Sequence, residues 1–355
     1  MARSPTTYRS KWRNGATTVI RVPVDLVSKI LEFARELDAK NELNVLREPE
    51  LPYRTAADVN ASEPVNVASV PQRSPFRYPG GKTWLVPYIR SWLRSKERHP
   101  SVLVEPFAGG ATVGLTAGFE GLVQHVVFVE NDPNVASVWQ AIFGGQAQWL
   151  AESIERFDLT RQNVLRVLQG EAISQRERAF STILRNRVQR GGIMADGAGL
   201  VKNGENGKGL SSRWYPQTLA RRIREISLVR DRFLFIEGDG IDVIRRYADV
   251  DDAVFFVDPP YTVAARRLYH RWQVDHRALF ELLSKVKGDV LLTYDNTREV
   301  VSLAREFGFE MELLAPKQDG EAKMTKLLIG KGFRKWFKQH SYRSVEVQRK
   351  NAYAN

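Results

Sequence analysis

From about residue 76 onward, apolar residues gather in short, nearly continuous runs that alternate with longer stretches of helical spacing. Continuous apolar runs are typical of strands covered on both faces, and their alternation with helices is typical of a parallel sheet. We predict six strands, at residues 101–106, 125–130, 233–239, 253–260, 289–295 and 324–331. The pattern therefore predicts an α/β fold with a mostly parallel, Rossmann-like sheet.

The first 70 residues have a different pattern and are predicted to form an N-terminal extension. Residues 16–23 alternate apolar and polar side chains like a strand, and Asp25 can cap a helix over residues 26–37. A basic strand followed by a helix also begins a ribbon-helix-helix DNA-binding fold. No convincing second helix follows, so a small packing or dimerising appendage is the favoured interpretation. The four prolines of residues 50–75 then indicate a linker.

Positive charge concentrates where the alternation of strands and helices is interrupted. The chain has 53 Lys and Arg against 41 Asp and Glu, a formal charge of +12. Residues 161–230 hold 14 basic against 5 acidic side chains, so this stretch alone carries +9. Such a balance favours a polyanionic partner, although a solvated basic helix face is the alternative. We predict a mainly helical insert at 145–232, with Arg185, Arg187 and Arg190 beside a glycine-rich loop.

The composition excludes several kinds of chemistry. The chain contains no cysteine, which rules out disulfides, thiolate metal sites and cysteine nucleophiles. Its five histidines lack metal-ligand spacing, so we expect no metal. No apolar run is long enough to span a bilayer, and the polar N-terminus does not resemble a signal peptide. We expect a soluble, cytoplasmic protein without a membrane partner.

Two glycine motifs are candidate ligand sites. Phe76 to Lys82 reads FRYPGGK, in which paired glycines allow close backbone approach and Lys82 supplies a charge for a carboxylate. Val104 to Ala111 reads VEPFAGGA and joins a strand to a helix, where a nucleotide-like ligand can lie against backbone amides. Glu130 ends the next strand, about 20 residues beyond Gly109, and can accept hydrogen bonds from ribose hydroxyls, with Asp132 as the alternative. Each motif alone could be a packing turn.

The most specific motif is Asp258-Pro259-Pro260-Tyr261, which follows an apolar strand. The prolines hold the backbone extended and remove two amide donors, so the Asp258 carboxylate and a backbone carbonyl can both act as acceptors. Two acceptors suit an NH2 group on a purine or pyrimidine ring. Hydrogen bonds to both hydrogens favour the pyramidal, nucleophilic nitrogen in the transition state. Tyr261 can stack on the base.

With these three motifs in this order, residues 76–331 resemble the GATC-type DNA adenine methyltransferases. The resemblance implies a catalytic domain at 71–144 and 233–335 and the DNA-recognition insert at 145–232. A basic tail at 336–355 lies outside the resemblance. The resemblance also implies transfer of a methyl group from S-adenosylmethionine to the N6 amino group of adenine in double-stranded DNA. By resemblance, Tyr78, Lys82, Glu105, Phe107, Gly109, Glu130 and Asp239 bind the cofactor, and Asp258 to Tyr261 hold the target base.

The chain departs from that family in three places. Glu130 replaces the usual Asp, and Lys326 stands where an acidic residue usually precedes the closing Leu-Leu. Arg190-Gly191-Gly192 replaces an Asn-Gly hairpin, so specificity for GATC does not carry over. The open alternatives are a cytosine-N4 DNA methyltransferase, an RNA or protein-glutamine methyltransferase, and a non-catalytic DNA-binding protein. The recognition sequence, the oligomeric state and any companion restriction enzyme are not encoded in these motifs.

Overall fold

The computed structural model describes residues 27, 31, 70–77, 81–172, 174–192, 199–204, 207–260, 274–314 and 326–331. The chain divides into two compact units, Met1–Val59 and Asn60–Asn355. In the first unit Val27 and Leu31 are helical and exposed, in agreement with the helix predicted over residues 26–37. The strand predicted at 16–23, most of the linker and the basic tail lie outside the described residues.

The second unit contains a seven-stranded sheet in the order β3-β2-β1-β4-β5-β7-β6. The first five of these strands run parallel, whereas β7 is antiparallel to both of its neighbours. Their bounds are β1 Val102–Glu105, β2 His125–Glu130, β3 Phe233–Glu237, β4 Ala253–Val257, β5 Asp289–Asp295, β6 Glu310–Leu314 and β7 Lys326–Gly330. The α/β fold with a mostly parallel sheet is therefore confirmed.

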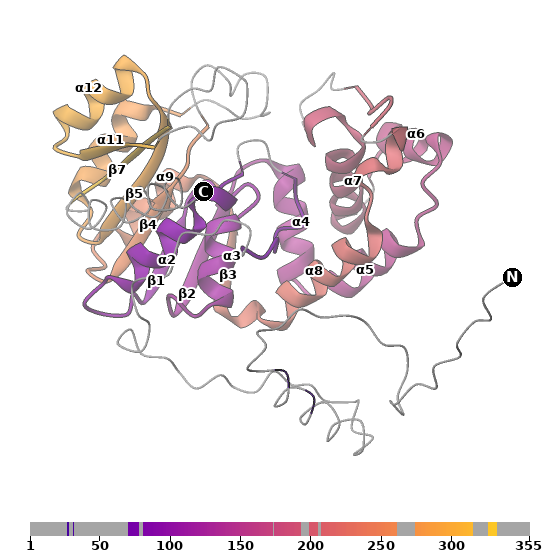
Figure 1. Ribbon diagram of the computed structural model, residues 1–355, viewed down its shortest axis with the longest axis horizontal. Coiled ribbons are helices and arrows are strands. Elements are labelled where there is room, and N and C mark those ends of the chain that lie inside the picture. The colour runs from indigo at the N-terminus through magenta and orange to yellow at the C-terminus, as the bar shows by residue number, and fades with distance from the viewer. Residues whose placement is uncertain are drawn as a thin grey trace, which may run out of the picture. The chain divides into compact units, whose positions relative to one another are not determined.

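Helices cover both faces of the sheet because successive strand residues point to opposite sides. On one face Leu103, Phe128 and Phe256 pack in a core with helices α2, α3 and α4. On the other face Val104 and Phe255 pack with helices α9, α11 and α12 (Figure 1). The bounds are α2 Val86–Arg94, α3 Thr112–Phe119, α4 Pro133–Phe143, α9 Gly240–Tyr247, α11 His276–Lys285 and α12 Arg298–Glu306.

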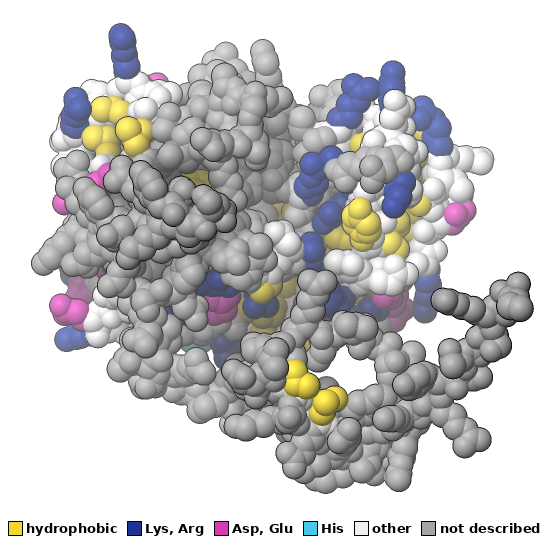
Figure 2. All heavy atoms as spheres, in the orientation of Figure 1, with side chains coloured by type: hydrophobic (Ala, Val, Ile, Leu, Met, Phe, Trp, Pro, Cys, Tyr) yellow, Lys and Arg dark blue, Asp and Glu magenta, His cyan; other side chains and the backbone are white. Residues whose placement is uncertain are grey.

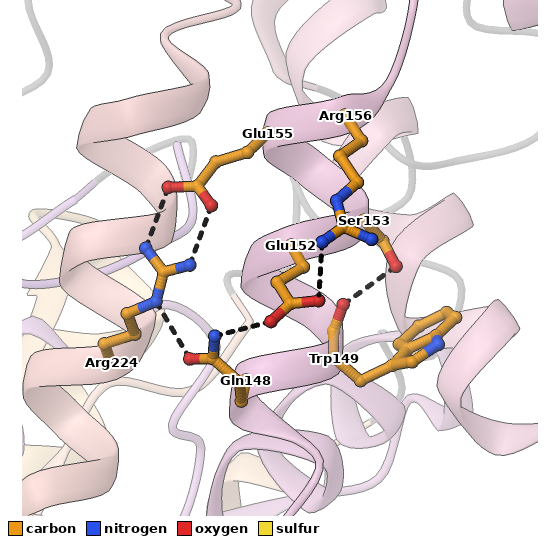
Figure 3. A network of polar contacts seen from close by, with 7 residues as sticks. All are labelled: Gln148, Trp149, Glu152, Ser153, Glu155, Arg156 and Arg224. Atoms are coloured by element: carbon orange, nitrogen blue, oxygen red, sulfur yellow. Dashed lines mark hydrogen bonds and ion pairs between the residues drawn. The ribbon is translucent and has the colours of Figure 1, made fainter.

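Between α4 and β3 the described residues include four further α-helices, which lie together beside the sheet in Figure 1. They are α5 Ala147–Arg156, α6 Arg161–Gln169, α7 Gln175–Val188 and α8 Pro216–Leu228. Helix α7 packs on α4, and α8 packs on α5. The guanidinium of Arg224 in α8 binds both carboxylate oxygens of Glu155 in α5, at 2.8 and 2.7 Å, and also Gln148 (Figure 3).

All six predicted strands are present, and β6 is an additional one. Its sequence, EMELL, alternates charged and apolar residues at the edge of the sheet, so it lacks the continuous apolar run that identified the others. In the parts of the chain that the structure describes, no helix combines the length and apolar character needed to cross a bilayer.

Candidate active site

The glycine turn and the Asp-Pro-Pro motif follow two neighbouring strands. β1 pairs with β2 on one side and with β4 on the other, so the strand order changes direction between β1 and β4. Ligands of open α/β sheets bind at this position, outside the carboxyl ends of the strands. Glu105 ends β1, and Asp258 directly follows β4. The topology therefore brings the two motifs to one edge of the sheet.

Backbone conformation in the glycine turn is unusual at two residues. Gly109 has φ +47° and Ala111 has φ +49°, and Ala111 is the only non-glycine residue with positive φ in the described part of the chain. A non-glycine residue in this region is uncommon, and such strain concentrates at ligand sites. The backbone N–H of Ala111 donates to the Ala108 carbonyl at 2.6 Å, which closes the turn at the start of α3.

Glu130 holds the glycine turn from the end of β2. One of its carboxylate oxygens accepts the N–H of Gly109 at 3.0 Å, and the other accepts the N–H groups of Asn131 and Asp132, each at 2.9 Å. Burial raises the pKa of Glu130 to about 7, opposed by these backbone hydrogen bonds. The sequence prediction for Glu130 named ribose hydroxyls, and the structure adds this contact with the turn. Asp132, the alternative, caps α4 by accepting the N–H of Asn134.

Glu105 lies beneath the turn and is almost fully buried. Its carboxyl oxygen accepts the N–H of Gly114 at 2.8 Å. Helix α3 can approach this closely because Gly114 has no side chain: a Cβ there would lie 2.5 Å from the same oxygen and 2.2 Å from the Phe128 ring. Burial raises the pKa of Glu105 to about 8; Asp258 raises it further and Lys82 lowers it.

The ion pair between Lys82 and Asp258 joins the first and last sequence motifs. Lys82 Nζ lies 2.5 Å from one carboxylate oxygen of Asp258, and the Thr293 hydroxyl donates to the other oxygen at 2.6 Å. Lys82 is buried, whereas Asp258 is partly exposed. Thr293 was not predicted from the sequence. It lies in β5, the strand next to β4, which is the one signal that could have identified it.

Two further predicted cofactor residues, Asp239 and Phe107, follow strands at the same edge of the sheet. Asp239 follows β3 and caps α9, where its side chain accepts the N–H of Ile241 at 2.8 Å. The following residue, Gly240, packs so closely on the glycine turn that a Cβ would lie 2.1 Å from the Pro106 carbonyl oxygen. Phe107 is partly buried against the core behind the turn. In the Asp-Pro-Pro-Tyr motif, Pro259 is buried and Pro260 partly buried. Tyr78 and Tyr261 lie outside the described residues.

The three predicted DNA-contacting arginines lie in different surroundings. Arg190 is exposed at the start of a short 3-10 turn, Arg190–Gly192. Arg185 is half-buried and donates to the Leu168 carbonyl at 3.4 Å. Arg187 is 7 % exposed and its guanidinium bonds the Pro75 carbonyl, so it is not available to DNA in this conformation. Burial disfavours the expected DNA contact of Arg187, and the expectations for all three arginines stay predictions.

Lys326, a departure from the family pattern, has a local explanation. It begins β7, where its ammonium forms an ion pair with Asp295 at the end of β5. Asp295 is 5 % exposed, and a buried carboxylate needs a partner. The positive side chain at position 326 therefore compensates an acidic one on the adjacent strand.

A Rossmann-like sheet with a glycine turn after β1 and Asp-Pro-Pro after β4 fits an S-adenosylmethionine-dependent methyltransferase, and the family match places the chain in that class. The chain belongs to the D12 class N6 adenine-specific DNA methyltransferase family, whose model matches residues 78–313. Its methyl donor is S-adenosylmethionine, and its reaction is methylation of the adenine N6 amino group in DNA.

Several solved structures are similar to the chain at low sequence identity and low TM-score. An rRNA methyltransferase from Streptomyces viridochromogenes has a TM-score of 0.36 and 13% identity, over 76% of this chain and 94% of that one. A putative RNA methyltransferase from Pyrococcus horikoshii has a TM-score of 0.33 and 12% identity, over 72% and 84%. A precorrin-6y methyltransferase from Geobacter metallireducens has a TM-score of 0.31 and 9% identity, over 68% and 85%. No curated protein matches the sequence significantly.

Proposed function

We propose that Asp258 and a backbone carbonyl of the Asp258–Pro260 turn accept the two amino hydrogens of an adenine rotated out of the duplex. The contact of Lys82 and Thr293 with the two oxygens of Asp258 carries this proposal. Two donors from different elements fix the carboxylate plane before the base arrives. Preorganised acceptors of this kind favour the transition state because they need no rearrangement during the reaction.

The residues of this edge suit the chemical groups of S-adenosylmethionine. Lys82 carries a positive charge for a carboxylate, and an ammonium has three N–H donors, so one pairing does not prevent another. Glu130 and Asp239 bring carboxylates to the ends of β2 and β3, where a ribose diol and an adenine amino group need acceptors. Glu105, Phe107 and Gly109 are proposed to shape the methionine side, and Tyr78 is proposed to help Lys82 hold the cofactor. The bound cofactor supplies an electrophilic methyl group on its sulfonium.

The chain then has few tasks in the chemical step itself. Asp258 and the turn carbonyl orient the amino nitrogen and draw its hydrogens out of conjugation with the ring. Tyr261 stacks on the base, and Pro259 and Pro260 keep competing amide donors away from the nitrogen. An adenine stacked in a duplex does not expose this nitrogen, so the base must leave the helix first.

Asp258→Ala tests the chemical part of the proposal. We expect the loss of one transition-state acceptor to lower kcat at least about a hundredfold, roughly 3 kcal/mol. Affinity for S-adenosylhomocysteine, measured by calorimetry, should stay within about threefold, because Asp258 contacts the base. A purified variant that methylates near the wild-type rate would remove Asp258 from this role.

The second part of the proposal is that residues 145–232 read the DNA target. Arginine and lysine side chains gather over these helices in Figure 2. Those that are exposed are Arg156, Arg161, Arg166, Arg176, Arg178, Arg190, Lys202, Lys208, Arg221, Arg230 and Arg232. Cations spread over one region are the electrostatic requirement for phosphate contacts. Mapping N6-methyladenine in genomic DNA, with and without the protein, tests whether methylation is site-specific.

A further inference from the structure

A buried amide joins the insert to the segment that precedes Lys82. Asn186 in α7 has no exposed surface, and its side-chain oxygen accepts the N–H of Arg77 at 2.8 Å. Its amide nitrogen donates to the carbonyls of Arg77 at 2.8 Å and Gly192 at 3.2 Å. A side-chain amide has one acceptor oxygen and two N–H donors. The Asn186 amide therefore has partners for its oxygen and its nitrogen, and these partners are backbone groups of two separate segments.

Two guanidiniums hold the preceding residues in the same way. Arg187 in α7 bonds the carbonyl of Pro75, and Arg222 in α8 donates to the carbonyl of Ser74 at 3.1 Å. Burial lowers the pKa of Arg187 to about 10, with Arg222 lowering it further, so Arg187 stays charged at neutral pH. Both bonds end on backbone oxygens. They therefore fix the path of the chain, whichever side chains Ser74 and Pro75 carry.

The segment Ser74–Arg77 is also tied to the cofactor edge. Phe76 is buried against Trp139, with ring centres 5.6 Å apart. Trp139 in turn donates its indole N–H to the Gly109 carbonyl at 3.0 Å. A shift of this segment would consequently be felt both at the glycine turn and at Lys82, which follows it in the chain.

On its other side, Asn186 supports the loop that carries Arg190. Gly192 has φ +73°, and a Cβ there would lie 2.6 Å from the Arg77 carbonyl oxygen. The base of the loop is closed by the Gln189 and Leu200 bridge and by the Arg190 N–H, which donates to Gly199 at 3.1 Å. The hydrogen bonds of Asn186 thus connect the turn that carries the exposed Arg190 with the segment that precedes Lys82.

We propose that Asn186, Arg187 and Arg222 are positioning residues that couple DNA contact at the Arg190 loop to the placement of Lys82. The inference rests on the proposed roles of Lys82 in the cofactor site and of the insert in DNA reading. Coupling of this kind is reciprocal: a cognate duplex changes the affinity for cofactor by the factor by which cofactor changes the affinity for duplex. Removing one of the hydrogen bonds made by Asn186, Arg187 or Arg222 lowers this coupling factor.

Arg222 and Arg224 form a matched pair for the test, because both are arginines of α8. Arg222 bonds the Ser74 carbonyl, whereas Arg224 bonds Glu155 in α5, inside the insert (Figure 3). S-adenosylhomocysteine, which cannot donate a methyl group, is titrated by calorimetry with and without a cognate duplex. For the wild type we expect the duplex to change its affinity at least about fivefold. Arg222→Ala should reduce this factor to below about twofold, and Arg224→Ala should leave it within about a factor of two of wild type.

Further variants keep the proposal testable if one of them unfolds. Arg222→Lys retains a donor for Ser74 and should restore at least about half of the coupling, which a general loss of stability would not do. Asn186→Ala should abolish the coupling while the salt dependence of binding to scrambled duplex stays unchanged. Equal coupling in the wild type and in Arg222→Ala, or none in the wild type, would overturn the inference. A wild type that neither binds S-adenosylhomocysteine nor methylates DNA would instead overturn the proposed function.

Discussion

The Thr293 hydroxyl provides a sharp test of how the active site holds its carboxylate. Thr293 has no exposed surface and donates to Asp258 at 2.6 Å. Thr293→Val keeps the shape of the side chain and removes the donor. A hydrogen bond to a charged group is worth about 1.5–3 kcal/mol, which corresponds to roughly a 10- to 100-fold change in rate if the bond acts fully in the transition state. We therefore expect kcat to fall within that range.

The assay is single-turnover transfer of a labelled methyl group to duplex DNA, together with calorimetry of S-adenosylhomocysteine binding. Lys82 still binds the other carboxylate oxygen, so affinity for S-adenosylhomocysteine should stay within about threefold. Thr293→Ser is the matched control, since it keeps the hydroxyl and loses one methyl group, at about 1 kcal/mol of stability. Its rate should remain close to wild type. A Val variant as fast as wild type would refute the idea that this hydroxyl positions Asp258.

Three further perturbations follow from the geometry. Gly109→Val should prevent binding of S-adenosylhomocysteine in a folded protein, because a β-branched residue resists φ +47° and fills space beside the ligand; calorimetry decides this. Arg190→Ala should reduce the logarithmic salt slope of duplex binding by about one if it contacts phosphate, or cost about 1–3 kcal/mol on cognate DNA alone if it reads a base. Because the pKa of Glu105 is raised in the folded state, we expect the free energy of unfolding of the wild type to decrease as pH rises from about 4.5 through about 8. Glu105→Gln should remove this decrease. Urea unfolding should show that the wild type loses on the order of 4 kcal/mol more stability than the variant across that pH range. Parallel plots of stability against pH for the two proteins would contradict the assignment.

The strands and the motifs at their ends could be predicted because both depend on local sequence. An apolar run that is buried on both faces looks the same wherever it lies in the sheet, and glycine and proline mark where it ends. The pairing of Lys82 with Asp258 could not be predicted from the residues alone. It joins the segment before α2 to the end of β4, and β1, β2, β3 and the insert separate the two in the chain.

Arg187 shows that a count of charges does not tell which basic side chains face the solvent, whereas helical spacing does. Ala179 and Ile183 are buried in α7 four residues apart, and Arg187 is the next position at that spacing. Side chains at i, i+4 and i+8 lie on one face of a helix, so Arg187 shares the buried face of Ala179 and Ile183. The role of Thr293 could not be predicted for a different reason. One hydroxyl within an apolar run does not distinguish a residue that positions a carboxylate from one that only packs in the strand.

Three ionisable groups lie close together at the centre of the site, and their charges decide what it can hold. Lys82 and Asp258 form an ion pair, which compensates both charges. Glu105 is the third group, and its pKa of about 8 makes it mainly protonated at pH 7. A second carboxylate charge beside Asp258 would be costly in this buried environment. With Glu105 neutral, the ion pair with Lys82 can keep Asp258 both charged and oriented, as its proposed role as acceptor for an adenine amino group requires.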